Sequence, residues 1–518
     1  MIEPIREPYA SAGASTVPSD SLPPSTSAPS GTSGMAPPPR WGRQATLIQP
    51  RQPAFWLYLV LLLIGGWFFF GQQSLMSSLS TAYLLSWALV LIYAIPVAFV
   101  VYRLDLFEHE PKILVAAALI WGGVIATSLA AEANSAWLEV LGKLASPGFT
   151  AVWGKAIVGP GVEETLKLAG VVLIYLIASD EFDGPMDGFV YGAMVGLGFT
   201  VVEDVSYFIN AVAAAPGAVD QAGPVFDTFI IRIVGGGLYG HVLFTGLTAT
   251  VFAYLMTRPL ASPLRRAGAL ACVFAGVAAH VTWNSPWMDS LLVTRDGGNP
   301  STLQWIEYGA IKGLPFLLLL GLLVFFATKN EESNFRAIVA GEPDPNLITE
   351  PEIRSLRSLL ARRNARNAGR VLHGAAGARL IGELQAAQIE YAMVRSRVGD
   401  VADPEVEHER RRIRGIKFAL ASLAPRSSHR APADPAPADL SPPVEAAPPD
   451  GGGWSPTHIV PPGGMPAWFA PDPTHQPVVI LPAQLEVAVQ DWLGAWAHVR
   501  AANGWQGWVD GRLLISGR

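Results

Sequence analysis

The chain has 518 residues, of which 50% are hydrophobic and 15% are charged, and its formal net charge at pH 7 is -6. Soluble globular chains carry about a quarter of charged residues, so this composition indicates a membrane protein. Nucleic acid as the main partner would require a strong basic footprint, which the acidic balance argues against. The single cysteine, Cys272, excludes an intrachain disulfide and a cysteine-based metal site.

The first region, residues 1–52, is rich in Ser, Pro, Gly and Thr and has few large apolar residues. Such a segment cannot bury enough apolar surface to offset the entropy lost on ordering, so we expect a disordered N-terminal tail. It also lacks the basic start, apolar centre and small-residue cleavage site of a secretory signal. We therefore expect the first apolar run to be a retained membrane anchor.

Residues 53–330 contain apolar runs that are each near the ~20 residues needed to cross a bilayer. Backbone groups in lipid must be hydrogen-bonded within their own segment, which favours helices. The predicted fold class is an all-α polytopic membrane protein with about eight transmembrane helices. The runs begin near Ala54, Tyr83, Ile113, Lys155, Asp187, Gly235, Ala267 and Tyr308.

Lys and Arg residues in the short loops predict the orientation of these spans. With a cytoplasmic N-terminus, most loop cations fall on the inner side, including Arg103, Lys112, Arg265 and Arg266. An even number of spans then places both termini in the cytoplasm. We expect a multi-pass protein of the cell membrane.

Two regions follow the last span. In residues 331–424 apolar residues recur at helical spacing, as at Ile353 and Leu356, which predicts a cytoplasmic helical region. Its basic face would either rest on anionic membrane lipid or be solvated. Residues 425–464 are rich in Pro, Ala and Gly, a composition typical of a flexible linker.

The end of the chain, residues 465–518, alternates apolar and polar positions and contains Asn503-Gly504. This pattern predicts a small C-terminal β module with a hairpin turn at Asn503-Gly504. The run from Asn503 to Asp510 resembles a strand pair of the small bacterial Src-homology-type β-barrels. A binding or regulatory appendage is the expected role.

The fourth predicted span contains three ionisable residues, Glu163, Glu164 and Lys167, just after Gly159-Pro160-Gly161. A charge in mid-membrane costs at least ~2.5 kcal/mol on insertion scales, so we expect each to be paired, to face a cavity or to be functional. We expect Pro160 to interrupt the helix, which would put both carboxylates in a first helical turn. Helical spacing predicts that Glu163 pairs with Lys167 and that Glu164 points elsewhere.

Later spans carry further polar residues within apolar sequence, namely Glu203 with Asp204, His241 with Thr245, and His280 with Asn284. In the predicted topology these residues and the Glu163 group all fall toward the outer membrane face. Taken singly, each of these residues also has a purely structural explanation. Glu163 with Lys167 could be a structural ion pair, and His241 could be a packing residue. Asp204 could face a loop, and Asp187 and Arg232 are expected at the membrane interface. The set together favours a functional site.

The set resembles the PrsW family of intramembrane proteases, which is related to the CAAX-processing and bacteriocin-processing membrane proteases. Glu163-Glu164-x-x-Lys167 matches the family's EExxK motif and Phe199-x-x-x-Glu203 its FxxxE motif, with His241 and His280 following. His280-x-x-x-Asn284 also fits the HxxxN motif of the CAAX-type relatives, which carry His where this chain has Glu203. The resemblance covers roughly Arg103 to Ala327 and leaves out the tail and the C-terminal third.

The resemblance implies hydrolysis of a peptide bond in a membrane-anchored protein substrate near the extracytoplasmic face, with an anti-sigma factor as a candidate. One of Glu163 and Glu164 would activate a water as general base, while the other pairs with Lys167. His280 and Asn284 would stabilise the oxyanion, and His241 or Glu203 would orient the water or protonate the amine.

The cofactor is expected to be either none or Zn. A zinc ion would be held by Glu164, Glu203, His241 and His280, since Glu and His are competent ligands. The absence of a His-Glu-x-x-His sequence and the metal-free interpretation of the CAAX-type relatives favour the metal-free alternative.

Two other functions stay open from the sequence. An ion- or proton-coupled transporter also uses broken helices and buried acids, but it predicts inverted repeats, and the core has one Gly-Pro-Gly interruption without a matching partner. A membrane scaffold would instead recruit partners through the C-terminal module and keep its buried charges for structure.

Overall fold

The computed structural model describes residues 41, 46–217, 219–236, 240–257, 262–292, 300–423, 455–468, 471, 477, 479–502 and 505–516. The chain divides into two compact units, residues 1–428 and residues 429–518. Most of the predicted tail and linker, and the predicted turn at Asn503-Gly504, lie outside the described residues. Within the described part of the tail, Trp41 is buried against Phe107 and its backbone N–H donates to Ser396 Oγ.

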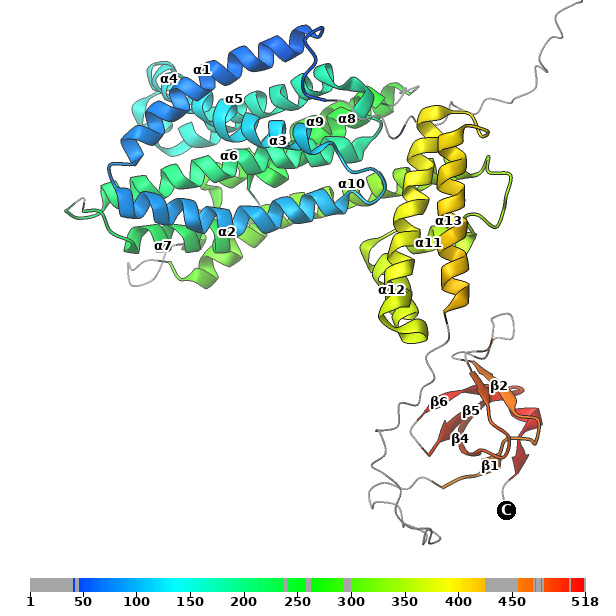
Figure 1. The fold of residues 1–518 in the computed structure, drawn as a ribbon. Coiled ribbons are helices and arrows are strands. Elements are labelled where there is room, and N and C mark those ends of the chain that lie inside the picture. The colour runs from blue at the N-terminus through cyan, green and yellow to red at the C-terminus, as the bar shows by residue number, and fades with distance from the viewer. Residues whose placement is uncertain are drawn as a thin grey trace, which may run out of the picture. The chain divides into compact units, whose positions relative to one another are not determined.

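The membrane part of the chain is a helical bundle (Figure 1). Its elements are α1 (Pro53–Met76), α2 (Ser80–Leu104), α3 (Lys112–Ile120), the π-helix η1 (Trp121–Ala126), α4 (Thr127–Leu144), α5 (Pro147–Ile177), η2 (Ser179–Glu181), α6 (Pro185–Ala214), α7 (Gly223–Phe229), the π-helix η3 (Ile230–Gly235), α8 (His241–Thr257), α9 (Pro263–Asn284), η5 (Pro286–Leu292) and α10 (Thr302–Val339).

The helices confirm a multi-pass membrane protein. In the part of the chain that the structure describes, five helical segments are long and apolar enough to cross a membrane: α1, α2, the continuous run from α3 to α4, α6 and α10. The other predicted spans lie on helices α5, α8 and α9. A total of about eight spans and the orientation of the termini stay predictions.

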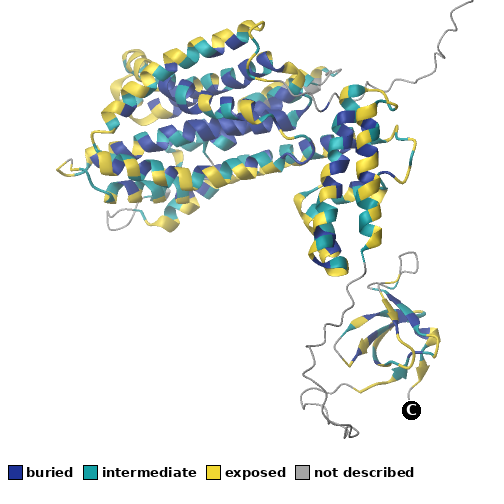
Figure 2. Ribbon diagram, in the orientation of Figure 1, coloured by how far each residue is buried: buried dark blue, intermediate teal, exposed yellow. Residues whose placement is uncertain are grey.

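Helix α6 is the core of the bundle, with 89% of its most apolar stretch buried against 22% for α1, α2 and α10 (Figure 2). It packs on α8 through glycines. A Cβ at Gly192 would lie 2.3 Å from Ala249 Cβ, and one at Gly196 would lie 2.2 Å from the carbonyl oxygen of His241. No larger residue fits at these positions. The glycines therefore let the start of α8 pack closely against α6, the helix that carries Glu203 and Asp204.

Helix α5 runs without a break from Pro147 to Ile177, so the predicted interruption at Pro160 is wrong. Proline removes one backbone donor, but membrane helices tolerate this loss because neighbouring groups satisfy the freed carbonyl. The N-terminus of the helix is instead capped by Ser146, whose side chain accepts a hydrogen bond from the backbone N–H of Phe149. Glu163 and Glu164 therefore lie in mid-helix, where side chains rather than the helix dipole must balance their charge.

The predicted cytoplasmic helical region contains α11 (Glu350–Leu356), α12 (Leu359–Val398) and α13 (Pro404–Ser422). Helix α12 is kinked at His373 and Gly374, and Gly374 adopts a φ of +69°, which glycine tolerates without strain. The kink folds the two halves of α12 together, because a Cβ at Gly369 would lie 3.0 Å from the carbonyl oxygen of Gly377.

The second unit confirms the predicted small β module, an antiparallel sheet curved into a half-barrel. Strands β5 and β6 form the predicted pair, and Val499, Val509 and Ala467 belong to the buried inner face. The strand order is β3-β2-β6-β5-β4-β1-β7. The strands are β1 (His458–Ile459), β2 (Met465–Trp468), β3 (Val479–Leu481), β4 (Glu486–Leu493), β5 (Trp496–Ala501), β6 (Gln506–Asp510) and β7 (Ile515–Ser516).

Candidate active site

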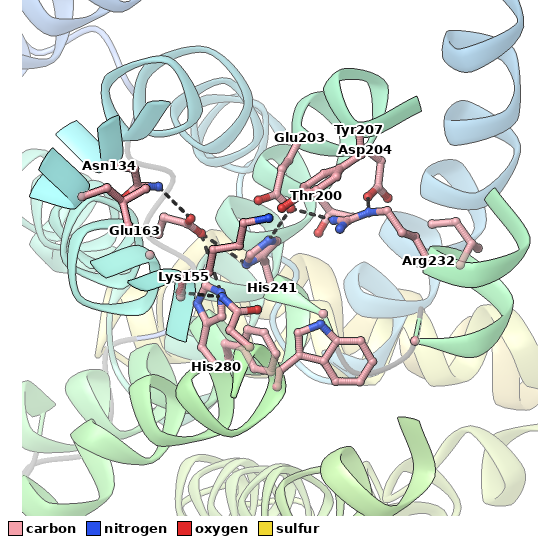
Figure 3. Close-up of a pocket in the computed structure, with 18 residues that line it drawn as sticks. Asn134, Lys155, Glu163, Thr200, Glu203, Asp204, Tyr207, Arg232, His241 and His280 are labelled. Atoms are coloured by element: carbon pink, nitrogen blue, oxygen red, sulfur yellow. Dashed lines mark hydrogen bonds and ion pairs between the residues drawn. The ribbon is translucent and has the colours of Figure 1, made fainter. Parts of the chain in front are cut away.

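Side chains from α4, α5, α6, η3, α8 and α9 line one cavity of about 290 Å³ inside the bundle (Figure 3). Its lining includes five predicted site residues, Glu163, Glu203, His241, His280 and Asn284. The other two, Glu164 and Lys167, lie behind this lining and bond to it. The structure thus brings all the predicted site residues together from four helices.

Lys167 is the centre of the cluster and is completely buried. Its Nζ lies 2.8 Å from Glu164 Oε1, 3.3 Å from Glu163 Oε2 and 2.7 Å from His241 Nδ1. The ammonium group has three donors, so these three acceptors satisfy it fully. The prediction that Glu164 points away from Lys167 is wrong, because residues three apart on a helix are also neighbours.

The tautomer of His241 can be assigned from its two partners. Nδ1 faces the Lys167 ammonium, which can only donate, so Nδ1 must accept. Nε2 lies 2.9 Å from Glu203 Oε2, a carboxylate oxygen that can only accept, so Nε2 carries the hydrogen. His241 is therefore a neutral imidazole that links Lys167 to Glu203.

The two adjacent glutamates differ in their surroundings. Glu164 is nearly fully buried, and its oxygens accept from Lys167, from His280 Nδ1 at 2.9 Å and from Thr245 Oγ1 at 2.9 Å. Glu163 lines the cavity, and apart from Lys167 it accepts a hydrogen bond from Asn134 Nδ2 at 3.1 Å. Glu163 is thus the carboxylate that can reach a bound molecule, and Glu164 orients Lys167 and His280.

Arg232, from the π-helix η3, lines the cavity, and its expected position at the membrane interface stays a prediction. Its Nη2 donates to Glu203 Oε2 at 2.7 Å and its Nε donates to Asp204. Asp204 is buried by this pairing and does not face a loop. The guanidinium also lies 3.8 Å from the centre of the Tyr207 ring.

Asp187 is buried in the protein, and its expected position at the membrane interface stays a prediction. Its Oδ2 accepts hydrogen bonds from the backbone N–H groups of Asp183 and Gly184, at the first turn of α6. It caps that helix and is not part of the cavity lining.

The last turn of α9 completes the cavity. His280 donates from Nδ1 to Glu164, which leaves an unprotonated Nε2 that lies 3.8 Å from Glu163 Oε2. Asn284 Nδ2 donates to the carbonyl oxygen of Lys155 at 3.2 Å. Buried Lys312 from α10 holds this end of the helix by donating to the carbonyl oxygens of Trp283 and Ser285.

Sequence reasoning missed the roles of Asn134, Arg232 and Lys312. Lys312 is an isolated cation in an apolar run, which is a usable signal on its own, whereas Asn134 lies among other polar residues, between Glu132 and Ser135. Arg232 could not be found this way, because η3 is a short element outside the long apolar spans.

The donor set fits a metal ion in type and number. In the described part of the chain, one group of three ligand atoms lies within 4.8 Å of one another, from Glu163, His241 and His280. This group contains Glu163, whereas the predicted ligand set contained Glu164 and Glu203 with the two histidines. Glu164 is bonded to His280 and Glu203 to Arg232. Zinc commonly binds three such ligands plus a water.

The charge balance of the cluster also leaves room for a cation. Four carboxylates are paired with two cationic side chains, Lys167 and Arg232; Glu163, Glu164 and Asp204 are buried and Glu203 is partly buried. Among these six groups two negative charges remain when every carboxyl group is ionised. A divalent cation or two protons would neutralise them.

Comparison with known proteins agrees with this geometry. Residues 110–319 match the family described as "PrsW family intramembrane metalloprotease". The chain is also similar to "Protease PrsW" from Geobacillus kaustophilus (strain HTA426), with 30% identity over 151 residues, which cover 28% of this chain and 60% of that protein. The chain thus spans less than two thirds of the length of that relative. No solved structure matches the chain.

The matched region contains the residues of the cavity, from Asn134 on α4 to Asn284 on α9. Both the sequence match and the convergence of the motif residues thus concern the same helices. Residues 110–319 of this chain are thus similar in sequence to the PrsW family, and they bring the motif residues together around one cavity.

Proposed function

We propose that the chain is an intramembrane protease that hydrolyses a peptide bond of a membrane-anchored protein near the extracytoplasmic face. The observation that carries the proposal is the pair formed by Glu163 and His280 Nε2, which face one cavity at 3.8 Å. A water between them could lose a proton to the carboxylate while it is held by the imidazole. An anti-sigma factor is a candidate substrate.

In this mechanism the water oxygen attacks the carbonyl carbon of the substrate, and Glu163 takes the proton of the water. The amide of Asn284, at the wall of the cavity, would donate to the developing oxyanion. Glu163 then returns the proton to the leaving nitrogen as the C–N bond breaks. Lys167, Glu164 and Glu203 would hold the base and the two histidines in position.

A metal-dependent protease is the second candidate, supported by the ligand geometry of Glu163, His241 and His280 and by the uncompensated negative charge. Zinc at this site would polarise the carbonyl group and lower the pKa of a bound water. The 2.7 Å contact between Lys167 and His241 Nδ1 would compete with such an ion. Metal analysis of the purified protein together with activity after chelation separates the two mechanisms.

The transporter alternative loses its main support, because α5 has no break at Pro160. The outward position of the site and the cytoplasmic termini follow from the loop cations and belong to the proposal.

The test uses the full chain in lipid vesicles with a tagged single-span anti-sigma factor from the same host. If that protein is not cut, the substrate is chosen from other single-span membrane proteins. The candidates are those that are shortened in cells with the unmodified chain and stay intact in cells with the Glu163→Gln chain. Glu163→Gln should reduce cleavage by ~10² or more, since general base catalysis contributes 10² to 10⁴. Glu139→Gln on α4 is the matched control, because Glu139 is exposed and outside the cavity lining. Undiminished cleavage by Glu163→Gln would refute the proposal.

A further inference from the structure

Gly159 leaves an open place in the wall of the cavity. It lies on α5, one turn before Glu163, and it forms part of the cavity lining. Apart from the backbone of α5, a Cβ at Gly159 would have two neighbours within 4 Å, Glu163 Oε1 at 3.4 Å and Asn284 Nδ2 at 3.6 Å. The place beside Gly159 is therefore bounded by the candidate base and the candidate oxyanion donor.

The fold of α5 does not by itself require glycine at this position. Gly159 precedes Pro160, and a Cβ on the residue before a proline disfavours the helical conformation. In two other membrane helices, however, a large residue precedes an internal proline, namely Ile95 in α2 and Leu314 in α10. Glycine also weakens a helix relative to alanine. The cavity, and not the helix, thus gives the reason for a bare backbone at position 159.

The two groups beside this open place have hydrogen-bonding capacity to spare. Glu163 Oε1 accepts from Asn134 Nδ2 at 3.1 Å, and a carboxylate oxygen can accept a second hydrogen bond (Figure 3). Asn284 Nδ2 donates one hydrogen to the carbonyl oxygen of Lys155, and its second hydrogen is left over. Among the described residues, no hydrogen bond joins Glu163 to Asn284. An acceptor and a donor thus border one open place.

A peptide unit has the complementary pair of groups. It offers one N–H donor and one C=O acceptor, and in a trans unit these point in opposite directions. A peptide unit over the bare backbone of Gly159 can donate to Glu163 Oε1 and accept from Asn284. The other oxygen, Glu163 Oε2, lies 3.8 Å from His280 Nε2, so a water held there would be next to the carbonyl carbon. A lipid chain offers neither a donor nor an acceptor.

We propose that the place beside Gly159 is the subsite for the scissile peptide unit of the substrate. The carbonyl oxygen points toward Asn284 and the nitrogen toward Glu163. This inference rests on the proposed protease function. It places the leaving nitrogen, which must gain a proton as the C–N bond breaks, beside the carboxyl group that has taken the proton of the water. A side chain at position 159 would hold the substrate away from both groups.

The test is Gly159→Ala in the full chain, with the single-span protein of the preceding test as substrate. The added methyl group would meet its neighbours at ordinary van der Waals distances, so the cavity can accommodate it without a shift. Gly161→Ala is the matched control, because it lies on the same helix, outside the cavity lining, where a Cβ meets no atom within 4 Å. Membrane insertion and thermal unfolding are compared for both variants.

We expect Gly159→Ala to lower kcat/KM about 10²-fold, because a misplacement of about 1 Å at the reacting centre has an effect of this size. Its unfolding temperature should not fall, since alanine favours the helix. Gly161→Ala should cleave like the unmodified chain. Full cleavage by Gly159→Ala would overturn the subsite. If the unmodified chain cuts no substrate, the protease function itself fails, which is a distinguishable result.

A double-mutant cycle with Asn284→Ala tests whether the two positions act on the same carbonyl group. Changes that disturb one shared contact do not add, whereas independent changes do. The chain with both Gly159→Ala and Asn284→Ala should therefore be about as slow as the slower single variant. A loss equal to the product of the two single losses would overturn the subsite.

Photolabelling gives a measurement that does not depend on the folding of Gly159→Ala. The substrate carries a diazirine side chain on the residue that supplies the scissile carbonyl group, as located from the cleavage products. It is photolysed with the Glu163→Gln chain, and labelled residues are mapped by mass spectrometry. Labels on α5 around Gly159 would support the subsite. Labels confined to the outward helices α1, α2 and α10 would overturn it.

Discussion

The Nζ atom of Lys167 lies 2.7 Å from Nδ1 of His241, so a buried ammonium group bonds directly to a buried imidazole. This contact joins the motif on α5 to the histidine that begins α8 and sets the tautomer of that histidine. Lys167 is therefore expected to organise the site and not only to neutralise one glutamate.

Replacing Lys167 by Met should remove both stability and activity. Glu163 and Glu164 would be left buried without their cation, and breaking a buried pair costs about 3 to 5 kcal/mol. Thermal unfolding in detergent and proteolysis in vesicles are the measurements. A Lys167→Met chain with unchanged stability would contradict this prediction.

Arg232 is predicted to be a positioning residue for Glu203 and His241. Arg232→Gln should lower kcat about 10- to 100-fold with little change in KM, the usual cost of losing a group that orients a site residue. Arg232→Lys keeps the charge and should recover part of the rate. If both variants lose the same activity, the guanidinium geometry and not its charge is what matters.

The close approach of α6 and α8 can be tested at Gly196. A Cβ there would lie 2.2 Å from the carbonyl oxygen of His241, so Gly196→Ala must displace the start of α8. We expect a loss of about 1 to 3 kcal/mol of stability, as for an overpacked core, together with reduced proteolysis. Gly66→Ala on α1, where a Cβ meets no atom within 4 Å, is the control and should behave like the unmodified chain.

Helices α12 and α13 are expected to lose stability in acid through Glu342. Burial tends to raise the pKa of this carboxyl group, but hydrogen bonds from Arg410 and Tyr391 outweigh it and hold the pKa below its ordinary value of 4.5. Because the pKa is lower in the folded state, the stabilisation is complete above the unfolded value and is lost as the pH falls toward the folded value.

Glu342→Gln should reduce this acid sensitivity and also lower stability at neutral pH, since the side chains of Arg410 and Glu342 are only 9% and 5% exposed. Thermal unfolding of the full chain between pH 3 and pH 7 is the measurement, with exposed Glu383→Gln as control. Identical pH profiles of the Glu342→Gln and unmodified chains would contradict this assignment.

The membrane class, the helical spans and the identity of the motif residues could be predicted from the sequence. Apolar length and buried charge are local properties, because the bilayer imposes the same requirement on each segment by itself. The alternation of residues after 465 likewise predicted the β module, since a strand shows its two faces within a few residues.

Only the tertiary structure decided which of the two glutamates faces the cavity, that Arg232 enters it, and that α5 continues through Pro160. Each of these depends on a partner far along the chain, such as His280 for Glu164 or Arg232 for Asp204. The sequence determined by itself that charge must be satisfied within the membrane, because an isolated charge there is too costly. Which partner satisfies each charge is a matter of distance between helices, and the glycine contacts of α6 set that distance.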